Sequence, residues 1–165
     1  MSNYKMAQSI YDFSVNDIDG NRVPLEKYRG HVCIILNVAS QCGLAKSNYS
    51  ELVDLYEAYS DSKGLRILAF PCNQFAGAEP GSGAEICEFA KRHKARFDFF
   101  EKINVNGADT HPLWKYLKHE QGGILGDFVK WNYTKFIVDK KGKPVERHGP
   151  NVSPKDLVTS LEKYW

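Results

Sequence analysis

The feature that most constrains the fold is a pair of apolar runs separated by a helical pattern. Residues 31–39 read His-Val-Cys-Ile-Ile-Leu-Asn-Val-Ala, and residues 65–70 read Leu-Arg-Ile-Leu-Ala-Phe. Largely apolar runs of this length, rich in β-branched side chains, are typical of strands buried on both faces of a parallel sheet. Between them a helix is expected over about 46–62, because one helical face gathers Leu52, Leu55, Tyr56 and Tyr59. The order strand, helix, strand predicts a right-handed βαβ unit.

The remaining segments extend this unit into one domain over residues 1–165. Residues 9–15 alternate apolar and polar side chains before Asp19-Gly20, which indicates an N-terminal β-hairpin. Further patterns predict helices over 84–93, over 109–119 (capped by Asp109 or Thr110, with Pro112 in the first turn) and from Ser153-Pro154 onward, and a hairpin over 134–147. We therefore expect an α/β, thioredoxin-like fold, with a central mixed β-sheet, helices on both faces and the N-terminal β-hairpin.

Composition excludes several classes of protein. The chain has 42% hydrophobic and 25% charged residues, as in ordinary globular proteins. A net charge of +2 is too small to favour nucleic acid as a partner. No apolar run approaches the ~20 residues of a membrane-spanning helix. The first eight residues lack the apolar core of a signal peptide, so we expect a cytoplasmic protein.

The cysteines do not suggest a disulfide framework or a metal site. The four cysteines are Cys33, Cys42, Cys72 and Cys87. In a cytosolic chain they need not pair. Their spacing relative to the histidines does not resemble a zinc site, and no metal is expected. Cys33 lies inside an apolar strand and is expected to be structural.

Cys42 stands where a reactive thiol would be placed. It follows the first apolar run and precedes the first helix. In such a turn, free backbone N–H groups and the positive end of the helix dipole favour the thiolate, which is the nucleophilic form. Because residue 45 is Ala, the turn does not carry the Cys-x-x-Cys pair of a dithiol exchanger.

Three blocks of sequence resemble the signature blocks of glutathione peroxidases. They are residues 37–43 (Asn-Val-Ala-Ser-Gln-Cys-Gly), 65–75 (Leu-Arg-Ile-Leu-Ala-Phe-Pro-Cys-Asn-Gln-Phe) and 130–136 (Lys-Trp-Asn-Tyr-Thr-Lys-Phe). The resemblance extends over nearly the whole chain. The connection 115–130 is short and lacks the insertion by which tetrameric members associate. The chain therefore resembles the monomeric phospholipid-hydroperoxide type.

This resemblance implies a peroxidase cycle without a bound cofactor. Cys42 would attack the peroxide and become a sulfenic acid, and glutathione, as reducing co-substrate, would restore it. Trp131 and Asn132 match the residues beside the reacting atom in the family, and both carry hydrogen-bond donors. Phospholipid hydroperoxides would be among the substrates, which implies peripheral contact with a membrane.

The chain departs from the family pattern at two positions. Where the family carries a glutamine donor near the reacting atom, this chain has Ala78, and Gln74 matches a different family position. Members that use thioredoxin carry a resolving cysteine where this chain has Lys91, with Cys87 about one turn earlier. Members without that cysteine usually carry selenocysteine at the position of Cys42, which leaves open whether Cys42 stands for a natural selenocysteine.

Three functions remain open from the sequence. The first is a glutathione-dependent peroxidase for lipid and small organic hydroperoxides and hydrogen peroxide. The second is a thioredoxin-dependent peroxidase with Cys87 as resolving thiol. The third is a redox sensor or binding protein on the same scaffold. The candidates for binding the carboxylates of glutathione or anionic headgroups are Lys46, Lys130 and Lys135, which could also be solvated surface lysines.

Overall fold

A five-stranded mixed sheet forms the centre of the computed structural model, which describes residues 3–123 and 126–165. The strands are β3 (Cys33–Val38), β4 (Arg66–Pro71), β5 (Asp98–Phe99), β6 (Lys135–Val138) and β7 (Pro144–His148), in the spatial order β5-β4-β3-β6-β7. β3, β4 and β5 run parallel, whereas β6 is antiparallel to β3 and β7 to β6. The expected thioredoxin-like α/β fold is thus confirmed.

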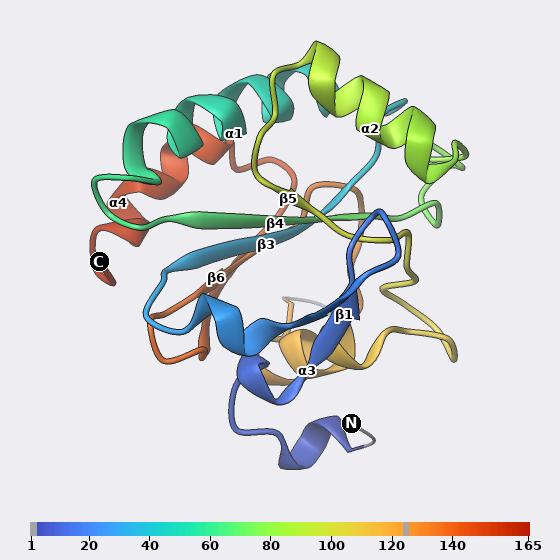
Figure 1. Cartoon of the computed structure of the whole chain (residues 1–165). Coiled ribbons are helices and arrows are strands. Elements are labelled where there is room, and N and C mark those ends of the chain that lie inside the picture. Colours follow the sequence, from blue (N-terminus) through green and yellow to red (C-terminus); the bar gives the residue numbers. More distant parts are fainter. Residues whose placement is uncertain (1–2, 124–125) are drawn as a thin grey trace.

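Helices cover both faces of the sheet (Figure 1). α1 (Ala45–Tyr59) and α4 (Val158–Leu161) lie on one face, and α3 (Pro112–Glu120) lies on the other. α2 (Gly83–Arg92) packs against α1, with the rings of Phe89 and Tyr49 5.0 Å apart. The expected βαβ unit is β3, α1 and β4.

The central strand β3 is buried along its whole length. Its side chains alternate between two apolar clusters, with Cys33 and Ile35 on the α3 side and Ile34, Leu36 and Val38 on the α1 side. Each such aliphatic side chain contributes roughly 1.5–3 kcal/mol by burial. This two-sided burial is why the strand shows no polar alternation.

The N-terminal hairpin is shorter than the alternation indicated. It pairs β1 (Ser14–Asn16) with β2 (Arg22–Pro24), and Gly20 has a φ of 89° in the turn. The first half of the expected strand is instead a 3₁₀ turn, η2 (Ile10–Asp12). Ser9 Oγ accepts the N–H of Tyr11 at 3.1 Å, and the Asp12 carboxylate accepts the N–H of Ser9 at 3.4 Å. These local hydrogen bonds compete with strand formation.

Some helix boundaries differ from expectation as well. Pro112 lies in the first turn of α3 as predicted, but the helix begins at that residue and not at 109, and its N-cap is His111, whose Nδ1 accepts the N–H of Leu113 at 3.1 Å; capping by Asp109 or Thr110 was wrong. The final helix opens after Ser153 as a 3₁₀ turn, η4 (Pro154–Leu157), that continues into α4. β5 has no counterpart in the sequence prediction, because two residues are too few for a pattern.

Several properties can be stated only for the residues that the structure describes. The connection 115–130, on which the expectation of a monomer rests, includes residues 124 and 125, which lie outside the described residues. Among the others, no helix is long and apolar enough to cross a membrane. No group of three or more metal-ligating side chains occurs within 3–123 and 126–165. All four cysteines are free.

Candidate active site

Cys42 lies just beyond the carboxyl end of β3, in the turn of residues 39–44 that leads into α1 and is called the thiol turn below. Its side chain is partly exposed, and its Sγ accepts the N–H of Leu44 at 3.4 Å. The sulfur lines an open cleft of about 410 Å³ that is formed by residues 41–44, residues 76–78 and Trp131. Segments distant in sequence therefore meet around this thiol.

Trp131 reaches the cleft because β6 runs antiparallel to β3. The residues that precede β6 lie at the carboxyl end of β3, where buried Asn37 holds them. Asn37 Nδ2 donates to the Trp131 carbonyl at 3.2 Å, and Asn37 Oδ1 accepts the N–H of Thr134 at 3.1 Å. Sequence reasoning assigned Asn37 no role, although a polar residue inside an apolar strand was a usable signal.

The two predicted donors occupy different surroundings. The side chain of Trp131 is 40% exposed, and its ring lies 5.8 Å from the ring of Phe75. Asn132 is fully buried and does not line the cleft with Cys42. Its amide has no hydrogen-bond partner among the described residues. An unpaired buried amide is costly to a fold, and such groups are often retained for function.

Tyr133 ties the Trp131 segment to the turn that carries Cys42. Its hydroxyl donates to the carbonyl of Ala39 at 2.6 Å. Burial raises the pKa of Tyr133 above its usual range, so the hydroxyl keeps its proton and remains a donor. The backbone of Tyr133 is left-handed, with a φ of 63°, a conformation that costs a non-glycine residue about 1–2 kcal/mol.

Ala78 contributes a wall but no side-chain donor to the cleft. Its carbonyl accepts the N–H of Gln41 at 2.9 Å, which places its methyl group beside the thiol turn. Gln74 does not replace the missing donor. Its Oε1 accepts the N–H groups of Val105 and Asn106 at 2.7 and 3.1 Å, and its Nε2 donates to the Asn106 carbonyl at 2.8 Å.

The three candidate lysines have different positions. Lys46, in the first turn of α1, and Lys130, next to Trp131, are exposed. Lys135 is fully buried, and its Nζ donates to the Val152 carbonyl at 2.8 Å. Burial lowers the pKa of Lys135 to about 8. This placement corrects the expectation of a ligand-binding lysine at 135, because β6 lies inside the sheet and is covered on both faces.

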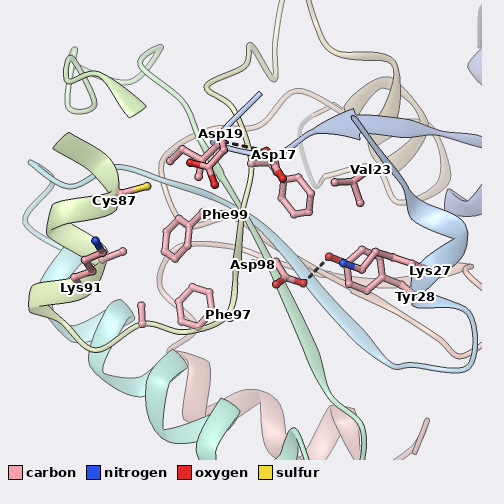
Figure 2. A pocket seen from close by; sticks show the side chains of 14 residues that line it. Asp17, Asp19, Val23, Lys27, Tyr28, Cys87, Lys91, Phe97, Asp98 and Phe99 are labelled. Carbon is pink, nitrogen blue, oxygen red and sulfur yellow. Dashed lines mark hydrogen bonds between the residues drawn. The ribbon is translucent and has the colours of Figure 1, made fainter. Parts of the chain in front are cut away.

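Cys87 and Cys42 open into different cavities. From α2, Ile86 and Phe89 face residues 40–41 of the thiol turn. Cys87 projects from another side of the helix into a separate cavity of about 310 Å³ (Figure 2). Burial raises the pKa of the Cys87 thiol. The structure thus does not bring the proposed resolving thiol to Cys42.

The other two cysteines are buried. Cys33 lies in β3 and Cys72 follows β4, and both belong to the apolar cluster on the α3 side of the sheet. Burial raises the pKa of each thiol. These surroundings fit structural cysteines.

Comparison with known proteins identifies relatives over nearly the whole chain. Residues 10–118 match the family model described as glutathione peroxidase. The chain is 53% identical over 163 residues to a phospholipid hydroperoxide glutathione peroxidase of Bos taurus, covering 98% of this chain and 82% of the relative. It is 55% identical over 157 residues to a putative chloroplastic glutathione peroxidase 7 of Arabidopsis thaliana, covering 94% of this chain and 67% of the relative.

Solved structures show the same similarity. The crystal structure of T. cruzi GPX1 superposes with a TM-score of 0.78 at 40% identity, covering 94% of this chain and 95% of that one. A thioredoxin-family thiol:disulfide interchange protein of Chlorobium tepidum superposes with a TM-score of 0.65 at 16% identity, covering 92% of this chain and 91% of that one. The second similarity concerns the fold alone.

Proposed function

The chain belongs to the glutathione peroxidase family, and from this premise we propose that it reduces lipid and other organic hydroperoxides, and hydrogen peroxide, through the thiol of Cys42. The observation that carries the proposal is the position of Cys42 Sγ. It lies in an open cleft, accepts a backbone N–H and shares the cleft with the indole of Trp131. A selenol at position 42 would follow the same steps.

The oxidative step transfers one oxygen atom. The sulfur of Cys42 attacks the distal peroxide oxygen, the O–O bond breaks, and a sulfenic acid and an alcohol form. The thiol proton passes to the alkoxide that leaves. The indole N–H of Trp131, which lines the cleft, is the side-chain donor assigned to stabilise the negative charge in this step; the family resemblance assigns the same role to the amide of Asn132, which is buried and outside the cleft lining.

We propose glutathione as the reductant. One glutathione condenses with the sulfenic acid to a mixed disulfide and releases water, and a second restores the Cys42 thiol and leaves as glutathione disulfide. The exposed ammonium groups of Lys46 and Lys130 suit the two carboxylates of glutathione. A thioredoxin route through Cys87 is less well supported, because that thiol lies within α2 and opens into a cavity that Cys42 does not line.

We propose phospholipid hydroperoxides as substrates, in line with the name of the Bos taurus relative. The side chains of Trp131 and Phe128 are 40% and 48% exposed, and Lys130 Nζ lies 5.3 Å from the centre of the Phe128 ring. Exposed aromatic rings beside lysine are suited to the interface of an anionic membrane. An open cleft at this edge would admit a peroxidised acyl chain while its headgroup stays at the surface.

The test is the fate of Cys42 after one equivalent of an organic hydroperoxide. We expect Cys42→Ser to abolish turnover while the fold persists, because serine does not reach the anionic form at neutral pH. The matched variant Cys87→Ser should retain turnover.

After one equivalent of the hydroperoxide, the intact mass of the protein should show one added oxygen, and then a glutathione adduct once glutathione is added. An internal disulfide that Cys87→Ser removes would favour the thioredoxin route, and an unchanged mass would favour a protein without peroxidase activity.

A further inference from the structure

A buried carboxyl group links the cleft wall to the turn that carries Cys42. Glu79 is fully buried, and its Oε1 accepts both the N–H of Ser40 at 3.1 Å and the hydroxyl of Ser40 at 2.5 Å. The neighbouring carbonyl of Ala78 accepts the N–H of Gln41 at 2.9 Å. Three hydrogen bonds therefore join residues 78–79 to residues 40–41, immediately before the thiol.

The loop held by these bonds does not adopt a relaxed backbone conformation. Ala76 and Gly77 follow each other with φ values of 56° and 60°. A left-handed alanine costs about 1–2 kcal/mol, so contacts from outside the turn must maintain this conformation. The Glu79 N–H also donates to Asn73 Oδ1 at 2.9 Å, which closes the loop over residues 73–79.

This loop carries two parts of the site. Residues 76–78 form the cleft wall opposite the thiol turn. Phe75, at the start of the wall, lies 5.8 Å ring to ring from Trp131, the donor assigned to the peroxide step. A shift of the loop would therefore move both the wall and the support of the indole relative to Cys42 Sγ.

We propose that Ser40 and Glu79 are positioning residues for the peroxide step, which hold the wall 76–78 and Trp131 at the Cys42 sulfur. This inference rests on the proposed function for its kinetic readout. Glu79 does not line the cleft and acts through the loop. Burial raises the pKa of Glu79, while the hydrogen bonds from Ser40 lower it. Either protonation state keeps an oxygen that accepts from Ser40, so Glu79→Gln should preserve the link.

The experiment compares Glu79→Ala, Glu79→Gln and Ser40→Ala in a Cys87→Ser background, where Cys42 is the remaining partly exposed thiol. Stopped flow measures the second-order rate of Cys42 oxidation by hydrogen peroxide and, separately, the reduction of the oxidised protein by glutathione. A misplaced group can cost up to about 100-fold in rate, so we expect Cys42 to be oxidised roughly 10- to 100-fold more slowly in Glu79→Ala. Ser40→Ala should also slow the oxidation, and Glu79→Gln should keep a rate near that of the parent.

The matched control removes a hydrogen bond of the same kind elsewhere. Tyr28 donates its hydroxyl to Asp98 Oδ2 at 2.5 Å, in the cavity that contains Cys87 and not Cys42 (Figure 2). Tyr28→Phe should lower the free energy of unfolding without changing the oxidation rate. Equal slowing by Tyr28→Phe and Glu79→Ala would reduce Glu79 to a general stabilising role and overturn the inference.

The remaining outcomes separate the inference from the function. Parent-like oxidation in folded Glu79→Ala would refute the positioning role and leave the peroxidase intact. Should Glu79→Ala not fold, Ser40→Ala decides, since a parent-like oxidation rate in that variant refutes the inference equally.

A parent protein inert to peroxide would refute the proposed function. In that case alkylation of Cys42 still tests the link, because a loosened wall should speed alkylation in Ser40→Ala relative to Tyr28→Phe, and equal rates would overturn it.

Discussion

Two residues next to the thiol turn, Ala76 and Tyr133, have left-handed backbone conformations, which residues other than glycine rarely adopt. Their φ values are 56° and 63°, and the only other described residue of this kind, Lys94, follows the end of α2. The cost of about 1–2 kcal/mol at each site is offset by fixed contacts, such as the hydroxyl of Tyr133 on the Ala39 carbonyl. Strain of this sort concentrates where a site must be held in one geometry.

Ala78→Gln should restore a donor to the cleft. A hydrogen bond to a charged group is worth about 1.5–3 kcal/mol, or roughly ten- to hundredfold in rate when it forms only in the transition state. The left-handed turn at 76–77 constrains where the new side chain can point, so we expect the lower end. The measurement is the rate of Cys42 oxidation by hydrogen peroxide, with the same change at exposed Ala58 as control. Equal rates in folded Ala78→Gln would mean that the existing donors suffice.

Among the elements, β3 and β6 do most to create the site. β3 is buried on both faces and delivers Cys42 at its carboxyl end. β6 runs the opposite way beside it, so the chain enters β6 at that same end and brings Trp131 with it. If β6 ran parallel to β3, the residues that precede it would lie at the amino end of β3, away from Cys42. The direction of one strand therefore decides that these two residues meet.

The edge strand β7 is tied to the C-terminal segment by Glu146. Its carboxylate accepts from Tyr164 at 2.6 Å and from His148 at 2.8 Å, with Lys163 at 3.4 Å. Burial opposes ionisation, but these hydrogen bonds prevail and lower the pKa of Glu146 to about 2. A depressed carboxyl pKa contributes stability above the unfolded pKa of 4.5, and this contribution disappears as the pH falls toward 2.

Glu146→Gln should therefore destabilise the protein by about 1–2 kcal/mol near neutral pH. The difference from the parent should shrink between pH 4.5 and about 2. Urea unfolding at a series of pH values measures it, with Glu57→Gln, at an exposed carboxylate 3.8 Å from Arg96, as control. A difference that is independent of pH would show that the charge of Glu146 does not carry the effect.

At the scale of the whole molecule, the sheet separates two apolar clusters. Lys135 is a charged side chain that is fully buried in this interior. Lys135 lies in β6, donates to the carbonyl of Val152 ahead of η4, and is attracted by Glu51 of α1. One ammonium group thus links the sheet, the long helix and the C-terminal segment. The cost of this link is the desolvation that lowers the pKa of Lys135.

The pH dependence of stability should reveal that cost. Lys135 titrates near pH 8 in the fold and near 10.5 in the unfolded chain, so between these values the unfolded chain binds more protons. The contribution of Lys135 to the free energy of unfolding therefore rises with pH across this window, by on the order of 2–3 kcal/mol. The difference in the free energy of unfolding between the parent and Lys135→Met should change by that amount over the same window. The control is Lys46→Met, at an exposed lysine, for which no such change is expected. A flat difference for Lys135→Met would contradict the burial of the charge.

Local patterns in the sequence were sufficient for the βαβ unit, for the hairpin predicted over 134–147 and found over 135–148, and for the placement of Cys42 between a strand and a helix. Apolar periodicity reports which faces of an element are buried, and the three signature blocks indicated the family. Boundaries that depend on single hydrogen bonds, such as the cap at His111 and the turn at Ile10–Asp12, were not accessible in this way. Each of these boundaries depends on a single capping side chain, and neighbouring residues in the sequence are equally good candidates for the cap.

Tertiary structure alone decided which side chains face each other. The sequence around Lys135 resembles that around Lys130, yet one is buried and the other exposed, because β6 is covered on both sides. Cys87 lies within one turn of the expected resolving position but opens into a cavity that Cys42 does not line. Which side of α2 faces the thiol turn depends on how the helix packs in the fold. The links of Asn37 to Trp131 and of Glu79 to Ser40 join residues far apart in the chain. No local pattern encodes such pairs, since they exist only once the sheet has brought its strand ends together.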